Sequence, residues 1–150
     1  MKFRTLVIVG IIATVSFSCA KETTSNQTDT QTQSVTNTAS PVVAEPGAFK
    51  PGEHPTQGKV SVVTEQGKSY LEFDGNFKTD NGPDLFVILH RSDAPPISGI
   101  KEKDYVSIAR LQKTSGNQRY ALPDNVKLGD FKSVAIWCRQ FNATFGYATL

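Results

Sequence analysis

The alternation of apolar and polar residues along the second half of the chain predicts β-strands. The segment 59–74, KVSVVTEQGKSYLEFD, alternates on either side of Gln66-Gly67, so its two halves are expected to pair as a hairpin. The run 85–90, LFVILH, is short and continuously apolar, with Gly-Pro before it and Ala-Pro-Pro after it. This pattern is typical of a central strand that is covered on both faces.

Further strands are expected along the rest of the chain, at 76–79, 105–111, 119–122, 133–138 and 141–150. The apolar residues of 105–111, YVSIARL, fit a strand or a short helix, and we favour a strand. In 141–150 we expect Phe141, Phe145 and Tyr147 to share one face. About eight short antiparallel strands separated by turns predict an all-β domain, either a sandwich or a partly closed barrel.

Residues 1–18 have the pattern of a signal peptide. Lys2 and Arg4 precede an uncharged run from Leu6 to Ser18, which matches the charged and apolar regions of an export signal. The run is too short for a transmembrane helix, which needs about 20 apolar residues. We therefore expect export of the chain.

Ser16-Phe17-Ser18-Cys19 resembles a bacterial lipobox, in which the cysteine receives diacylglycerol and becomes the new N-terminus. Ser18 fits that pattern, whereas Ser16 and Phe17 depart from it. The resemblance implies a lipid on Cys19 that anchors the protein in the bacterial cell envelope, facing the periplasm or the exterior. The alternative is ordinary signal peptidase cleavage after Ala20, which would leave a secreted protein without a lipid.

Residues 19–46 are expected to form a disordered tether. Between Thr23 and Ser40 nearly every residue is Thr, Ser, Gln or Asn, so this segment cannot bury enough apolar surface to offset the entropy of ordering. As a flexible coil it would span about 30 Å. The remaining residues, 47–150, are enough for one modest hydrophobic core and therefore for one domain.

The charge of the chain argues against nucleic acid as a partner. The net charge is +2, and it falls to zero when Lys2 and Arg4 of the expected signal peptide are removed. No stripe of basic residues marks the remainder, although such a stripe is typical of nucleic-acid-binding domains.

Cys138 is the residue on which the candidate chemistry depends. The chain has two cysteines, and lipidation or removal of Cys19 leaves Cys138 without an internal disulfide partner. Strand alternation places Cys138 on the same face as Val134 and Ile136, with Trp137 on the other face. Four interpretations stay open for this thiol: a buried hydrophobic side chain, an intermolecular disulfide, a redox or metal site, or a catalytic nucleophile.

His54 and His90 are the two histidines of the chain, so any cysteine–histidine site must use one of them. Cys138 with both histidines would match the ligand set of blue copper, but the clustering of ligands near the C-terminus that such proteins show is absent. A closed zinc site needs four ligands, and Cys138 with the two histidines supplies three, so a carboxylate would have to be the fourth. We therefore expect no metal site. A cysteine hydrolase is disfavoured because no elbow motif or orienting partner is evident.

Three phrases of the sequence resemble the electron-transfer DM-thirteen (DM13) domain family: HPTQGKV at 54–60, YLEFDGNFKTDNGPDLFVIL at 70–89, and WCRQFNATFG at 137–146. They occur in the family's order across nearly the whole of the expected domain. The signature cysteine of the family maps onto Cys138, and its His-x-x-x-Gly motif maps onto His54 and Gly58. Pro55 follows His54 here, where insect members usually have Gly.

The resemblance implies a β-rich extracytoplasmic redox domain that passes electrons, or supports oxidative cross-linking, through Cys138. Our hypothesis adds His54 as a candidate assisting residue. The family is known from insect Skeletor-type proteins, beside DOMON domains, and from single-domain bacterial lipoproteins. The redox partner and any cofactor stay unassigned. The alternative hypothesis is a non-catalytic envelope binding or scaffold domain in which Cys138 is a structural core residue.

Overall fold

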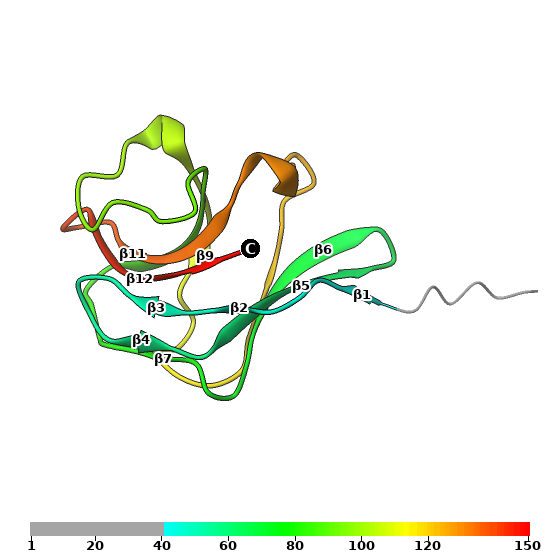
Figure 1. The fold of residues 1–150 in the computed structure, drawn as a ribbon, viewed down its shortest axis with the longest axis horizontal. Helices are drawn as coiled ribbons and strands as arrows, with labels where there is room; N and C mark the ends of the chain where they lie inside the picture. Colours follow the sequence, from blue (N-terminus) through cyan, green and yellow to red (C-terminus); the bar gives the residue numbers. More distant parts are fainter. Residues whose placement is uncertain (1–40) are drawn as a thin grey trace, which may run out of the picture. The chain divides into compact units, whose positions relative to one another are not determined.

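The computed structural model describes residues 41–150, so the expected signal peptide, Cys19 and most of the expected tether lie outside the described residues. The described region consists of β-strands joined by turns and loops, with two single-turn 3₁₀ helices, η1 (Glu102–Asp104) and η2 (Leu128–Asp130) (Figure 1). Within it, no helix has the length and apolar character needed to cross a membrane. The prediction of an all-β domain is confirmed.

The first sheet is built around the predicted hairpin. Val62 pairs with Leu71 across it, and the turn residues Gln66 and Gly67 have φ angles of 51° and 77°, as in the tight turns that match the twist of paired strands. The sheet contains β1 (Val42–Val43), β2 (Gly47–Ala48), β5 (Lys59–Glu65), β6 (Lys68–Phe73) and β10 (Gln118–Ala121). Val42 and Val43 fall inside the expected tether, yet they pair with β5.

The second sheet has the order β3-β12-β11-β8-β9, with every neighbouring pair antiparallel. Its strands are β3 (Lys50–Pro51), β8 (Leu85–His90), β9 (Tyr105–Arg110), β11 (Ser133–Cys138) and β12 (Ala143–Thr149). β8 and β11 have the predicted bounds, and β9 is a strand rather than a helix. A small separate sheet pairs β4 (Thr56–Gln57) with β7 (Lys78–Thr79).

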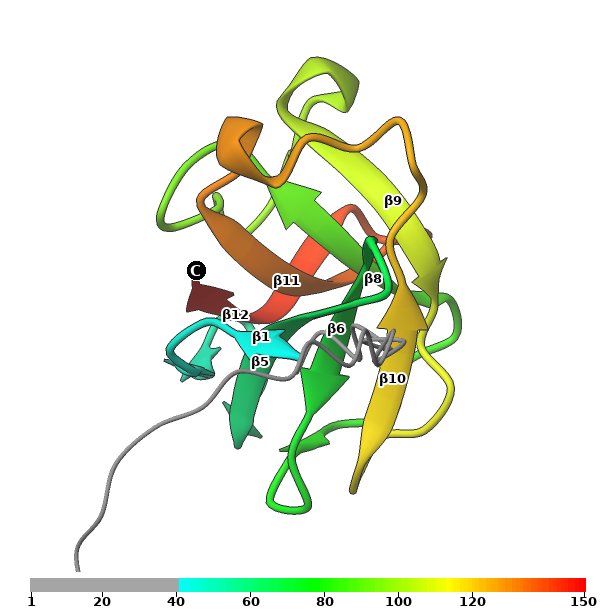
Figure 2. The same ribbon diagram turned by 90° about the vertical axis from the view of Figure 1, so that its right-hand side faces the viewer.

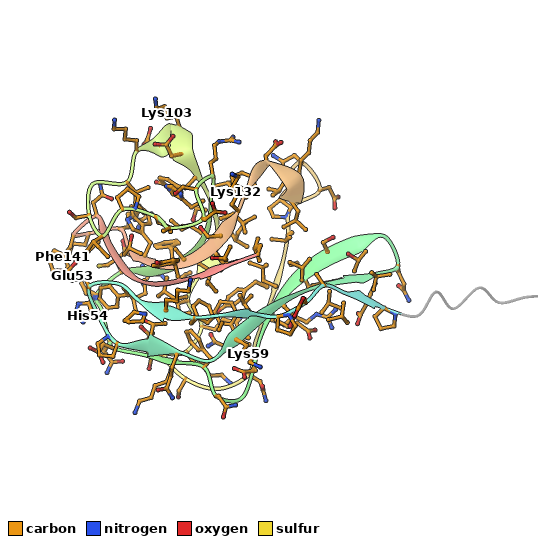
Figure 3. All side chains as sticks on the ribbon, in the orientation of Figure 1. Glu53, His54, Lys59, Lys103, Lys132 and Phe141 are labelled. Carbon is orange, nitrogen blue, oxygen red and sulfur yellow. The ribbon has the colours of Figure 1, made fainter. Side chains whose placement is uncertain are left out.

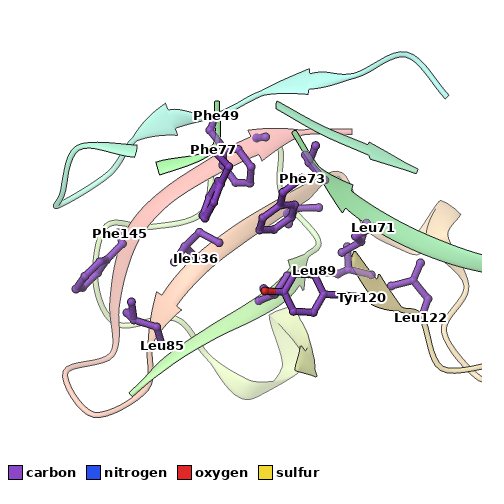
Figure 4. Packing of buried hydrophobic residues seen from close by; sticks show 14 of the residues in the cluster. Phe49, Leu71, Phe73, Phe77, Leu85, Leu89, Tyr120, Leu122, Ile136 and Phe145 are labelled. Atoms are coloured by element: carbon purple, nitrogen blue, oxygen red, sulfur yellow. The ribbon is translucent and has the colours of Figure 1, made fainter. Parts of the chain in front are cut away.

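The two large sheets face each other as a sandwich, and no strand pairing closes them into a barrel within residues 41–150 (Figure 2). Between them lies a packed group of apolar side chains, which we call the main cluster (Figure 4). It includes three phenylalanines, Phe49, Phe73 and Phe77, whose ring centroids lie 4.7 to 5.2 Å apart. Burial of such apolar surface is the dominant favourable contribution to folding.

The second sheet is also covered on its outer face. Ile88, Ile100, Ala135 and Trp137 form a smaller outer cluster there. Trp137 packs against Tyr105 with ring centroids 5.0 Å apart. This arrangement confirms that β8 is covered on both faces and that Trp137 points away from the face that carries Cys138.

The predicted alternation over 141–150 is wrong at both ends. Phe141 precedes β12 and is 63% exposed, while Phe145 joins the main cluster and Tyr147 packs against the outer cluster. Phe141 is exposed because it lies in the turn between β11 and β12. The opposite faces of Phe145 and Tyr147 result from a β-bulge: Ile136 pairs with Gly146 and Trp137 with Thr144, so Phe145 is the extra residue. A bulge shifts the alternation by one residue and moves later side chains to the opposite face.

Candidate functional site

Cys138 is the last residue of β11 and lies inside the main cluster with no exposed surface. Its register partners are Leu85 on β8 and Ala143 on β12. The thiol is free, with no disulfide to any described residue. Because the sulfur is enclosed by apolar side chains, direct attack on a substrate or disulfide formation with another protein would first require the fold to open.

His54 lies between β3 and β4 at one end of the sandwich (Figure 3). Its Nδ1 is 3.0 Å from Oδ2 of Asp80, and its side chain is 35% exposed. A carboxylate only accepts hydrogen bonds, so Nδ1 is the donor and Nε2 is the acceptor nitrogen of the neutral ring. Asp80 thus fixes both the ring orientation and the tautomer of His54.

Phe145 connects the surroundings of His54 with those of Cys138. The His54 ring stacks on the Phe145 ring with centroids 3.9 Å apart and planes at 30°, while Phe145 and Cys138 belong to the same cluster. Within the described region, the hydrogen bond of the His54 ring goes to Asp80 and not to Cys138. The predicted pair therefore lies at one end of the sandwich, with no hydrogen bond between the two side chains within residues 41–150.

His90 lies at the other end of β8 from the strand partner of Cys138. Ser133 pairs with His90 and Cys138 pairs with Leu85, so five residue steps, about 17 Å, separate the two positions along the strands. A copper site made by Cys138 and both histidines is therefore excluded by the topology. Residues 41–150 also contain no group of three or more His, Cys, Asp or Glu side chains that could hold a metal ion.

His90 is nonetheless an unusual residue. It is 4% exposed, and its Nδ1 accepts a hydrogen bond from the Ser92 backbone N–H at 3.1 Å. Its Nε2 is buried and has no hydrogen-bond partner among residues 41–150. Burial lowers the pKa of His90 from its ordinary value of 6.5, against a smaller opposing effect from Asp104. Burial thus disfavours the charged form of the ring.

The glycine of the His-x-x-x-Gly motif has a structural explanation. Gly58 has a φ of +99°, and a Cβ added there would lie 2.5 Å from the Cα of Phe77. Only glycine adopts this conformation without strain and permits so close an approach. The glycine of the motif therefore allows the turn before β5 to pack closely against the backbone of Phe77.

Sequence reasoning missed an ionic group beside Cys138. Arg139 Nε lies 2.8 Å from Oδ2 of Asp84, and Arg110 binds the other carboxylate oxygen. Both guanidinium groups also lie over the ring of Phe86, at 4.5 Å for Arg139 and 5.4 Å for Arg110. The partners are far apart in the sequence, so no local pattern could have indicated them.

Comparison with known protein families gives a match over most of the described region. The family model described as Electron transfer DM13 matches residues 48–150. No curated protein and no solved structure matches the chain.

Proposed function

Because the chain belongs to the electron transfer DM13 family, we propose that it is a membrane-anchored extracytoplasmic electron-transfer protein whose redox group is Cys138. The family match carries the redox part of this proposal. It spans residues 48–150 and so includes β8, β11 and β12, the strands that surround the thiol. Cys138 is the single cysteine of the matched region, which makes it the one thiol there whose oxidation state can change.

The burial of Cys138 favours transfer of an electron over thiol–disulfide exchange. Exchange needs a thiolate that reaches another sulfur directly, and the Cys138 side chain has no exposed surface. In the one-electron step, the S–H bond breaks, the electron passes to an oxidised metalloprotein partner, and the proton passes to a base or to water. A reduced partner returns the electron, and the thiol is restored when it regains a proton.

His54 is the candidate assistant in this step. Its acceptor nitrogen, Nε2, is set by the hydrogen bond of Nδ1 to Asp80, and the stacked Phe145 connects the ring to the cluster that holds Cys138. With no hydrogen bond to the thiol within residues 41–150, His54 would receive the proton through water or after a local opening. We therefore propose His54 as the proton acceptor of this step.

Voltammetry of the full chain tests the redox proposal. We expect the wild type to show an oxidation wave that Cys138→Ala lacks, since the variant has no sulfur at this position, while the waves of the other oxidisable side chains appear in both proteins. Near-ultraviolet circular dichroism would verify that the variant is folded. Identical waves in the two proteins would refute Cys138 as the redox group.

The scaffold alternative is favoured by one observation, the position of Cys138 among apolar side chains with no exposed surface. If Cys138 is purely structural, its replacement by an apolar residue of similar size, such as valine, should leave the stability nearly unchanged, whereas its replacement by serine should lower it. A serine hydroxyl without a partner in this cluster would cost about 1–3 kcal/mol of unfolding free energy. Full partner binding by a Cys138→Val chain that shows no redox activity would favour the scaffold over electron transfer.

A further inference from the structure

The two ring nitrogens of His90, the last residue of β8, have different surroundings. Nδ1 accepts a hydrogen bond from the Ser92 backbone N–H at 3.1 Å, so the neutral ring carries its proton on Nε2. That Nε2–H is buried and has no partner among residues 41–150. Because a buried donor without a partner lowers stability, the structure around this ring is expected to open more readily than a fully bonded one.

Residues 92–95, which we call the covering segment, are attached to this ring through Ser92. The Ser92 Oγ also lies 2.8 Å from Nδ1, and the Ser133 Oγ donates to the Ser92 O at 2.7 Å. The next residue, Pro96, is held separately, because its backbone oxygen accepts a hydrogen bond from the Thr144 Oγ1 at 2.6 Å. Ser92 therefore fixes the covering segment to the ring, and the segment ends where the chain is attached to β12.

A second proton on the His90 ring would remove the acceptor that Ser92 uses. The Nδ1 of an imidazolium is a donor, so it would face the Ser92 backbone N–H without bonding to it. The Ser92 Oγ can accept the new N–H, but the backbone N–H would lose its partner, and the buried Nε2–H would carry part of the positive charge. A hollow of about 370 Å³ lined by His90, Ser92 and Ala94 gives water room to reach these groups once Ser92 moves.

The charged and titratable neighbours of His90 come from each element around it: Arg91 and Asp93 before and within the covering segment, Asp104 on η1, Tyr105 on β9 and Lys132 before β11. Asp104 attracts a positive charge on the ring, but this effect is smaller than the opposing effect of burial. The Arg91 guanidinium donates to the backbone oxygens of Lys103 and Asp130. No carboxylate of residues 41–150 forms a hydrogen bond or ion pair with the His90 ring, so an imidazolium would have no counter-charge in contact with it.

We propose that the covering segment is a pH-sensitive conformational switch: protonation of His90 releases residues 92–95 from the ring, while the chain from Pro96 stays attached to β12. In the open state, water can bond to both ring nitrogens and to the Ser92 N–H. An exposed histidine has its ordinary pKa of 6.5, so between the lowered pKa of the closed state and 6.5 a decrease in pH shifts the population toward the open state. The switch does not depend on the redox function proposed for Cys138.

Hydrogen exchange of backbone amides, followed by NMR on the ¹⁵N-labelled full chain, tests the switch. The protection of an amide is the exchange rate of an unstructured chain divided by the observed rate at the same pH. We expect the protection of the Ser92 N–H to fall by up to about fivefold over about one pH unit below 6.5, which is the linkage expected for a ring with a pKa of 6.5 in the open state. Ala135 and Ile136 in β11 should keep their protection, because the sheet stays folded.

The same substitution at each of the two histidines provides matched variants. His90→Gln retains an acceptor for the Ser92 N–H and cannot be protonated, so the protection of Ser92 should no longer depend on pH. His54→Gln, at the histidine that bonds to Asp80, should retain the pH dependence of the wild type. The Cε1–H signal of His90 in the wild type gives a measurement that needs no variant, and its titration midpoint should lie below 6.5.

Any one of four results would overturn this inference. The first is a protection of Ser92 in the wild type that does not change with pH, and the second is a pH-dependent loss that persists in His90→Gln. The third is a His90 titration midpoint at or above its ordinary value of 6.5. The fourth is an equal loss of protection at Ser92 and Ile136, which would show unfolding of the whole domain and not a local opening.

Discussion

At the scale of single residues, the structure changes what an experiment on Cys138 can decide. Because the thiol is fully buried, resistance to thiol reagents in the folded state is expected for a redox residue and for a structural one. Reagent labelling therefore does not separate the two roles. An electrochemical measurement does, because a buried donor can exchange an electron without contact with a reagent.

His90 makes the unfolding free energy depend on pH. Burial lowers the pKa of His90 below 6.5 in the folded protein, so between that lowered pKa and 6.5 the unfolded chain binds more protons than the folded one. By linkage, the unfolding free energy falls as the pH decreases through this interval. Above pH 6.5, where His90 is neutral in both states, no stability is lost through its titration. Urea denaturation of the wild type at a series of pH values should show this loss.

His90→Gln is the matched variant for that prediction, since glutamine does not titrate and its amide can still bond to Ser92. The difference in unfolding free energy between wild type and variant should shrink or change sign as the pH falls below 6.5. A difference that stays constant with pH would contradict the assignment, because the carboxylates that titrate at lower pH are common to both proteins.

At the scale of elements, the long strands could be predicted from the sequence, and so could the short β7 within the expected strand at 76–79, but β1 to β4 could not. β8 and β11 follow from uninterrupted apolar and β-branched residues, and the β5–β6 hairpin from alternation around Gln66-Gly67. β1 to β4 have two residues each, too few to show a period. The bulge at Phe145 also escaped prediction, because it depends on pairing with β11 and not on the local sequence.

The candidate site was predictable only in part for the same reason. Cys138, His54 and the shared face with Ile136 follow from local patterns and from the family resemblance. The stacking of His54 on Phe145 and the Arg139–Asp84 pair join residues that are distant in the sequence. Such pairs are fixed by the order of strands in the sheets, which one sequence does not specify.

Two of the turn glycines, Gly58 and Gly67, allow an element-scale prediction. Gly58→Ala should destabilise the domain by more than about 1 kcal/mol, because its φ is +99° and the new Cβ would lie 2.5 Å from the Cα of Phe77. Gly67→Ala is the control, since its φ is +77° but nothing lies within 4 Å of the added atom. Chemical denaturation should show the larger loss for Gly58→Ala, and equal losses would mean that the approach to Phe77 is unimportant.

At the scale of the whole molecule, the proposal depends on how the domain is attached to the cell envelope. Cys19 lies outside the described residues, and its lipidation rests on the sequence pattern at Ser18-Cys19. The proposed anchor and the proposed redox group are the two cysteines of the chain. A lipid on the first would leave the second without an internal disulfide partner.

Expression in a bacterial host tests the anchor. The wild type should fractionate with membranes and show a mass larger than that of the cleaved chain by a diacylglycerol group, with any further acyl chain adding to it. Cys19→Ser should lose both the added mass and the membrane association, while near-ultraviolet circular dichroism of the domain stays the same. Recovery of the wild type in the soluble fraction, with an N-terminus after Ala20, would instead indicate ordinary secretion.

The short strand β1 has a mechanical consequence for an anchored protein. It joins β5 through the pairs Val42–Thr64 and Val43–Val63, and both of its valines are largely exposed. A pull on the N-terminal side would reach these few contacts before any residue of the main cluster. Release of residues 41–46 would lengthen the proposed tether by about 20 Å at full extension. Detachment of β1 would thus let the anchored domain move farther from the membrane under load while the main cluster stays folded.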